Sequence, residues 1–141
     1  MKKAHQERSQ KKFRDMLRVK RLLVCGSRYW TNQSLISMCI RFYNPEIVIH
    51  GNARGADSIA GEEAKKLGIE VKAFPANWDL YGRAAGAIRN QQMIDEGQPD
   101  FILAFHDFIE ISKGTKDMLK LARRHNIPWE LVESNEDCRG P

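Results

Sequence analysis

Short apolar runs alternate with longer amphipathic segments from residue 21 to residue 132, and this alternation restricts the fold more than any other feature of the sequence. Five runs have the length of strands, and several of them are rich in Val, Ile or Phe. They span residues 21–25, 46–50, 70–74, 100–105 and 129–132. Segments with the length of helices lie between them, at residues 32–43, 56–67, 84–96 and 115–125. Strands and helices in this alternation form β-α-β units around a parallel sheet.

The predicted fold class is therefore α/β, in the form of a single Rossmann-like three-layer sandwich with a five-stranded parallel sheet. A chain of 141 residues is long enough for one such domain and too short for a separate substrate domain. We expect a basic N-terminal arm over residues 1–20, the Rossmann-like domain over residues 21–133, and a flexible C-terminal tail over residues 134–141.

The positive charge of the chain is concentrated in the predicted arm. The net charge is +5, but residues 1–20 hold eight Lys and Arg against two Asp and Glu, so the remaining residues carry a net charge of −1. The sequence therefore does not predict a basic face on the folded domain for duplex DNA. Two interpretations of the arm stay open, namely a solvated tail or short docked helix, and a contact with nucleic acid.

Several classes of protein are excluded by what the sequence lacks. No apolar stretch approaches the roughly 20 residues that a membrane span needs, so we expect no membrane contact and a cytoplasmic protein. The three cysteines are too few and too far apart for a disulfide framework or a zinc site, and the four histidines are scattered. We expect neither a metal nor a cofactor.

The loops that follow the predicted strands are the expected site of function, because ligands of open parallel sheets bind beyond the carboxyl ends of the strands. Gly51, Gly55 and Gly114 lie between a strand and a helix, where backbone N–H groups can approach a phosphate. Arginine side chains in or beside these loops can grip a phosphate with two hydrogen bonds, or else pair with nearby carboxylates. These arginines are Arg28, Arg54, Arg83 and Arg89.

Two common nucleotide-binding fingerprints are absent. Gly26 begins no Gly-x-Gly-x-x-Gly sequence, and Lys113-Gly114-Thr115 lacks the upstream glycine of a P-loop, which disfavours simple NAD dehydrogenases and P-loop ATPases. Aromatic side chains in the loops can stack on a base or pack within the protein. They are Tyr29, Trp30, Trp78 and Tyr81. Asp57 is predicted in the first turn of its helix, where it can cap the helix or bind a ligand.

Five short motifs occur in order along the predicted domain, and together they resemble the YspA-like branch of the SLOG superfamily. They are VCGSR at 24–28, HGNARGAD at 50–57, PANW at 75–78, GRAAGAIRN at 82–90 and SKGT at 112–115. The resemblance covers residues 21–132 and implies a Rossmann-like domain that binds nucleotides or nucleotide-derived ligands. It also implies kinship with phosphoribohydrolases of the LOG type and with the DNA-processing protein DprA, and it implies a homo-oligomer.

The sequence departs from the phosphoribohydrolase pattern at one position. Those relatives carry Gly-Gly-x-Gly-Thr-x-x-Glu, and Met118 occupies the place of the catalytic glutamate here, whereas their companion arginine looks retained as Arg89. Cleavage of an N-glycosidic bond passes through a cation-like sugar that a carboxylate stabilises. The resemblance thus implies retained phosphate and ribose contacts without the usual catalytic group, unless Asp57 or Asp79 replaces it.

The function that these observations favour is the binding of a phosphorylated nucleoside or nucleotide-derived small molecule, as a sensor or sequestering module. The predicted ligand-binding residues are Gly26, Ser27, Arg28, Gly51, Arg54, Gly55, Asp57, Arg83, Arg89, Asn90, Gly114 and Thr115. One alternative is a nucleotide-processing N-glycoside hydrolase, with Asp57, Asp79 and Arg89 as candidate catalytic residues. A third, less favoured reading is a single-stranded nucleic-acid binder that uses the basic arm.

Overall fold

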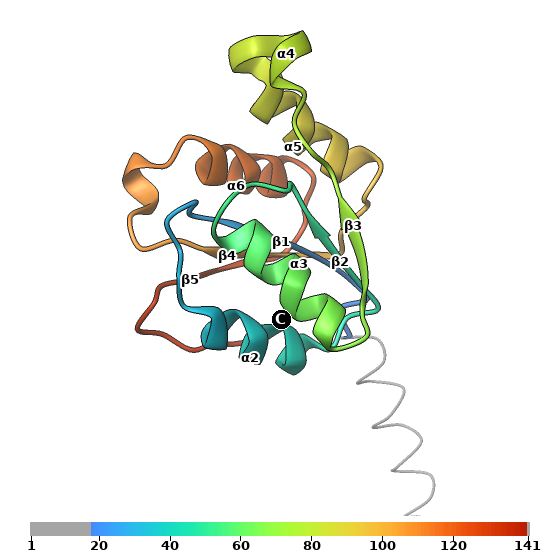
Figure 1. The fold of residues 1–141 in the computed structure, drawn as a ribbon, viewed down its shortest axis with the longest axis vertical. Coiled ribbons are helices and arrows are strands. Elements are labelled where there is room, and N and C mark those ends of the chain that lie inside the picture. Colours follow the sequence, from blue (N-terminus) through green and yellow to red (C-terminus); the bar gives the residue numbers. More distant parts are fainter. Residues whose placement is uncertain (1–17, 141) are drawn as a thin grey trace, which may run out of the picture.

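The computed structural model describes residues 18–140, which form one parallel sheet with helices on both faces (Figure 1). The order of the strands is β3-β2-β1-β4-β5, and every neighbouring pair is parallel. The strands are β1 (Arg21–Gly26), β2 (Ile47–His50), β3 (Glu70–Ala73), β4 (Phe101–Phe105) and β5 (Trp129–Val132). The helices are α2 (Gln33–Tyr43), α3 (Ala56–Lys66), α4 (Trp78–Tyr81), α5 (Ala85–Asp95) and α6 (Gly114–Arg124). The predicted five-stranded parallel sheet is confirmed.

The expected strands and long helices are all present, and their ends lie within a residue or two of the predicted ones. The starts of two helices follow from side-chain caps. The Asn32 side chain accepts a hydrogen bond from the Leu35 N–H at the start of α2 (3.1 Å). The Ser112 hydroxyl accepts one from the Thr115 N–H at the start of α6 (3.0 Å). Each cap satisfies a backbone donor that the first turn of a helix leaves without a partner.

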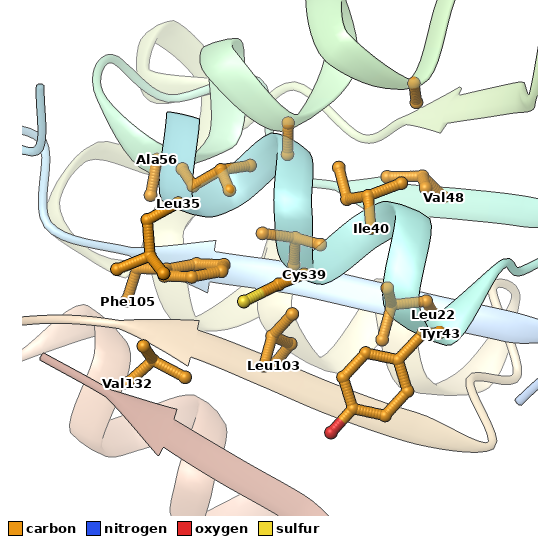
Figure 2. Packing of buried hydrophobic residues seen from close by; sticks show 14 of the residues in the cluster. Leu22, Leu35, Cys39, Ile40, Tyr43, Val48, Ala56, Leu103, Phe105 and Val132 are labelled. Carbon is orange, nitrogen blue, oxygen red and sulfur yellow. The ribbon is translucent and has the colours of Figure 1, made fainter. Parts of the chain in front are cut away.

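The sheet is the middle layer of three, because its two faces bury separate groups of apolar side chains. On one face, side chains of α2 and α3 pack against β1, β2 and β4, as Figure 2 shows around Cys39 and Leu103. On the other face, Met93 of α5 and Met118 of α6 pack against alternate residues of the same strands. Leu22 faces the first group and Leu23 the second, as the alternation of side chains along a strand requires.

Two segments differ from the expectation of plain loops. Residues 78–84 form the short helix α4 and a turn of 3-10 helix (Gly82–Ala84), and Ile109–Ile111 form a second 3-10 turn. The Asn77 side chain caps α4 by accepting a hydrogen bond from the Leu80 N–H (3.1 Å). A four-residue helix is too short to show a helical period in a sequence. In Figure 1, α4 stands beyond α5 at the top of the view, away from the sheet.

The chain crosses the sheet between β3 and β4, so the order of the strands reverses between β1 and β4. Neighbouring loops after these two strands diverge toward opposite faces, which opens a crevice at their carboxyl ends. The segment after β5 also lies near this end, since the Ser134 N–H donates to the Asp107 carboxylate (2.7 Å). Within residues 18–140, no helix has the length and apolar character needed to span a bilayer.

Candidate functional site

A pocket of about 680 Å³ lies where the order of the strands reverses, at the carboxyl ends of β1 and β4. Its volume falls in the range of roughly 300–1,000 Å³ that small-molecule sites occupy. The loop after β1 and the loop before α6 form its walls, and side chains from α3, α5 and α6 line it further. We call this cavity the switch pocket.

The wall from β1 depends on a glycine. Gly26 has a φ of +153°, and a Cβ atom there would collide with the Phe105 carbonyl group of β4 and with the Ala56 side chain. The next residue closes the junction, because the Ser27 N–H donates to the Phe105 carbonyl oxygen (2.8 Å). Residue 26 therefore has to be glycine if the ends of β1 and β4 are to stay in contact at this edge of the pocket.

Asp57 is the buried acidic group of the pocket. Its side chain is 5% exposed, and its Oδ2 atom accepts hydrogen bonds from the Gly51 N–H (2.9 Å) and the Ala53 N–H (3.4 Å). Burial raises the pKa of Asp57 to about 6, and the positive charge of Arg89 and the two backbone N–H groups limit that rise. The switch pocket thus holds a carboxyl group that titrates close to neutral pH.

Arg89 and Asn90 connect the loop after β2 to α6. The Arg89 guanidinium donates to the Gly51 carbonyl oxygen, and its Nε–H donates to the Asn90 Oδ1 atom (3.1 Å). The Asn90 amide in turn donates to the Gly114 carbonyl oxygen (3.3 Å) and to the Asp117 carboxylate (3.0 Å). The network holds both side chains in the pocket lining and directs the Asp117 carboxylate to Asn90.

Two exposed cations and one exposed carboxylate, that of Asp107, line the pocket near its mouth. Arg28 and Lys113 both line it and are exposed, and none of the ion pairs within residues 18–140 involves either side chain. Gly114 begins the eleven-residue helix α6, and no heavy atom lies within 4 Å of where its Cβ would be. The start of a helix attracts anions through its N–H groups and its dipole. The mouth is therefore suited to an anion such as phosphate.

Apolar groups complete the lining. Tyr29, Phe108 and Ile111 line the pocket although they are 86%, 70% and 81% exposed. Below them, the buried side chains of Met93 and Met118 also reach the cavity. An apolar surface beside an anion site is typical of pockets that bind a flat ring attached to a charged group.

The structure brings together most of the predicted ligand-binding residues. Those that line the switch pocket are Gly26, Ser27, Arg28, Asp57, Arg89, Asn90, Gly114 and Thr115. Those outside its lining are Gly51, Arg54, Gly55 and Arg83. The candidate catalytic residue Asp79 is exposed on α4 and is also outside the lining, whereas Met118 lies within it. A ligand-binding role for any of these residues remains a prediction.

Gly51 and Gly55, the two loop glycines outside the pocket lining, leave space for other residues of the protein rather than for a ligand. A Cβ at Gly51 would lie 2.5 Å from an Nη atom of Arg89, and the Gly51 N–H is already bonded to Asp57. Gly55 has a φ of +73°, and a Cβ there would collide with the backbone of Ser27 and Arg28. Both glycines hold the loop after β2 against its neighbours, which supports the pocket from behind.

Other residues of the site carried no clear signal in the sequence. His106 lines the pocket, and burial lowers its pKa, whereas the negative charge of Asp107 acts in the opposite direction. Its Nδ1 atom accepts a hydrogen bond from the Phe108 N–H (2.9 Å), which fixes the loop after β4. Cys25 also reaches the pocket, but burial raises the pKa of its thiol, so it is not an activated nucleophile. Ser112 also lines the pocket, and its hydroxyl accepts the hydrogen bond from the Thr115 N–H.

His50 lies behind the pocket at the end of β2. Burial lowers its pKa to about 4, and the positive charges of Lys65 and Arg89 add to the effect. Its neutral Nδ1 atom accepts a hydrogen bond from the Asn52 N–H (3.0 Å). No group of three or more His, Cys, Asp or Glu side chains in residues 18–140 is placed to hold a metal ion.

Comparison with known proteins relates this chain to one family and one fold. Residues 20–81 match the YspA, cpYpsA-related SLOG family. The chain is 30% identical over 120 residues to the Gene 61 protein of Mycobacterium phage D29, an alignment that covers 78% of this chain and 94% of that protein. The structure is similar to that of DNA processing protein A (DprA) from Streptococcus pneumoniae, with a TM-score of 0.62 at 16% identity. That similarity covers 84% of this chain and 51% of DprA, so the chain spans about half of DprA, and it concerns the fold alone.

Proposed function

The chain belongs to the YspA, cpYpsA-related SLOG family, and we propose that it binds a phosphorylated nucleoside or another nucleotide-derived small molecule in the switch pocket. Binding without turnover makes it a sensor or a sequestering module. The observation that supports the proposal most is the composition of the pocket lining. Two exposed cations, Arg28 and Lys113, line the pocket together with the first residue of α6 and with exposed apolar side chains.

The proposed arrangement assigns the phosphate to the mouth of the pocket. The backbone N–H of Gly114 donates a hydrogen bond to it, and Arg28 neutralises its charge. The sugar and base then lie against the apolar mouth, with Asp57 as a hydrogen-bond acceptor below them. Arg89 acts from the pocket wall, where it also keeps Asp57 partly ionised through its positive charge.

The test is mass spectrometry of the full chain after incubation with nucleoside monophosphates, ADP-ribose and cyclic nucleotides, reading both retained ligand and released base. We expect at least one compound to be retained intact, and Arg28→Ala to weaken its binding by about 10- to 100-fold, since a hydrogen bond to a charged group contributes about 1.5–3 kcal/mol. Arg41→Ala is the matched control, because Arg41 is exposed on α2 away from the pocket. If no compound is retained, or if both variants bind as the wild type does, the proposal is wrong.

We propose one second candidate, an N-glycoside hydrolase, because Asp57 combines a place in the pocket with a pKa near 6. Such a carboxyl group can donate a proton or steer water near neutral pH. Free base would then accumulate in the same experiment, and Asp57→Asn would stop it. Asp79 is less suited to that role, because it is exposed on α4 and outside the lining.

We also propose that the chain forms a homo-oligomer, as its family resemblance implies. The support is an apolar group that protrudes on α4 and α5, where Trp78, Leu80, Tyr81 and Ile88 are 54%, 66%, 46% and 40% exposed. Clustered exposed apolar side chains often mark protein interfaces. Sedimentation equilibrium tests this proposal, with Leu80→Glu expected to yield monomers and Met38→Glu, at an exposed position on α2, as the control.

A further inference from the structure

A second hollow adjoins the switch pocket and shares one wall with it. This side groove, of about 550 Å³, lies between the loop after β1 and the helix α3. Its lining includes Arg28, Tyr29 and Trp30, which also line the switch pocket. The remaining lining residues are Thr31, Gly55, Ser58, Ile59 and Glu62. Residues 28–30 thus form a ridge with one hollow on each side.

The backbone of the ridge is fixed at several points. The Ser27 carbonyl oxygen accepts hydrogen bonds from the Trp30 N–H (3.2 Å) and from the Ala56 N–H at the start of α3 (3.1 Å). The Trp30 indole is buried against Phe105 and donates to the Asn32 carbonyl oxygen (3.0 Å). The backbone of Gly55 packs against Arg28 from the other side. The ridge therefore keeps its place between the two hollows.

The two outer side chains of the ridge, Arg28 and Tyr29, belong to the lining of both hollows. Arg28 and Tyr29 are exposed, Tyr29 by 86%, and neither side chain forms a hydrogen bond or ion pair with residues 18–140. A guanidinium can hold a phosphate with two hydrogen bonds, and a phenol ring offers a face on which a base can stack. The ridge thus presents a phosphate-binding and a stacking group at the border of two cavities.

The side groove has fewer cations in its lining than the switch pocket, which is lined by Arg28, Arg89 and Lys113. Arg28 is its one cation among the described residues, whereas Glu62 contributes an exposed carboxylate. Ser58 and Thr31 add hydroxyl groups, and Ile59 adds an apolar surface. A carboxylate repels a second phosphate but accepts hydrogen bonds from hydroxyl and amine groups. The groove therefore suits a neutral sugar or base.

We propose that the ligand has two parts, a nucleotide in the switch pocket and a second nucleoside or sugar in the side groove, joined through a phosphate bridge at Arg28. This inference rests on the proposed function and specifies the class of its ligand. Both hollows have volumes within the usual range of small-molecule sites, and the shared guanidinium lies where the bridge would pass.

Calorimetric titration of the full chain tests the inference. The probes are adenosine and guanosine monophosphates, the corresponding 3′,5′-linked dinucleotides with a 5′-phosphate, and ADP-ribose. We expect at least one two-part probe to bind at least about tenfold more tightly than its mononucleotide, because the second contact becomes intramolecular. Thr31→Trp, which fills the side groove, should remove that gain and leave the affinity for the mononucleotide within about twofold.

Each variant in the side groove has a control variant outside it, so that an effect of the groove can be told from an effect of the substitution itself. Ser34→Trp places the same ring at an exposed position of α2 outside both hollows, and it should keep the gain. Glu62→Ala should lower the gain severalfold, whereas Glu70→Ala on β3 should not. If a mononucleotide binds but no two-part probe binds more tightly, or if the gain survives Thr31→Trp, the inference of a side-groove ligand is wrong and the proposed function stands. If no probe binds at all, both are wrong.

Discussion

The Arg89 guanidinium fills the space that a side chain at residue 51 would need, and it donates a hydrogen bond to the Gly51 carbonyl oxygen. This contact joins α5 to the loop after β2, across 38 positions in the sequence. It also places a positive charge near Asp57, whose Oδ2 atom accepts the Gly51 N–H. The glycine, the arginine and the aspartate therefore form one unit, in which Arg89 and Asp57 line the switch pocket and Gly51 lies behind them.

Gly51→Ala should destabilise the fold, because the new methyl group would force the Arg89 guanidinium out of its place. A Cβ at residue 51 would lie 2.5 Å from Nη1 of Arg89. We expect a loss of about 1–3 kcal/mol in the free energy of unfolding, measured by urea denaturation. The cost should fall when Arg89→Ala is already present, because the clash is then gone.

The control for that measurement is Gly86→Ala in α5. A Cβ at residue 86 would meet only the Trp78 ring, at an ordinary distance of 3.5 Å. Alanine is a better helix former than glycine, so this variant should be neutral or stabilised by up to about 1 kcal/mol. Equal costs of Gly51→Ala with and without Arg89 would contradict the unit described above.

The fold could be predicted from the sequence almost completely, because the central strands β1, β2 and β4 are buried apolar runs and the long helices between the strands are amphipathic. Ile102 and Leu103, adjacent in β4, are both fully buried, on opposite faces. The helix α4 escaped prediction because its four residues bury nothing and its start depends on a cap by Asn77.

The position of the site could be predicted from the sequence, but the roles of its individual glycines could not. The rule for parallel sheets places Ser27 and Gly114 at the same edge, and both line the pocket. A loop glycine looks the same in a sequence whether it makes room for a ligand or for another side chain. Gly51 and Gly55 make room for Arg89 and for the Ser27–Arg28 backbone, which only the folded chain reveals.

Asp57 should make the protein less stable as the pH rises. Its pKa is about 6 in the folded state against 3.8 for the ordinary side chain, so its contribution is fully present below pH 4 and is lost as the pH rises through 6. The full loss is about 3 kcal/mol, at 1.36 kcal/mol per pKa unit. Asp57→Asn does not titrate, so its stability relative to the wild type should increase by about that amount between pH 4 and pH 7.

Denaturation of both proteins at several pH values measures this difference. Asp100→Asn is a control for the loss of a carboxylate, because Asp100 is exposed and binds the backbone N–H groups of Lys20 and Arg21 at the far end of the sheet. A difference between Asp57→Asn and the wild type that stays constant from pH 4 to pH 7 would show that Asp57 has an ordinary pKa.

His50 should act in the opposite direction. Its pKa is lowered from 6.5 to about 4, so its contribution to stability is present above pH 6.5 and is lost as the pH falls through 4. The loss amounts to about 3 kcal/mol. His50→Asn keeps an acceptor for the Asn52 N–H and should remove this sensitivity to acid.

The effects of Asp57 and His50 on the free energy of unfolding should largely cancel in the wild type between pH 4 and pH 6. Asp57→Asn should therefore lose stability steeply on acidification, whereas His50→Asn should gain it. The pKa of His50, followed by NMR of its ring protons, provides an independent check. A His50 resonance that titrates near pH 6.5 would contradict the account of a neutral imidazole behind the pocket.

Calorimetric titration of the full chain and of Gly114→Trp with nucleoside monophosphates tests the proposed nucleotide site in the switch pocket. The position is open, because a side chain there would meet no other part of the described chain within 4 Å of its Cβ, so the indole should fill the mouth of the switch pocket without disturbing the core. Lys120→Trp, at an exposed position further along α6, is the matched control. We expect binding to the wild type and to Lys120→Trp, and none to Gly114→Trp. Binding that is equal in all three proteins, or absent from the wild type, would contradict a nucleotide site at the ends of β1 and β4.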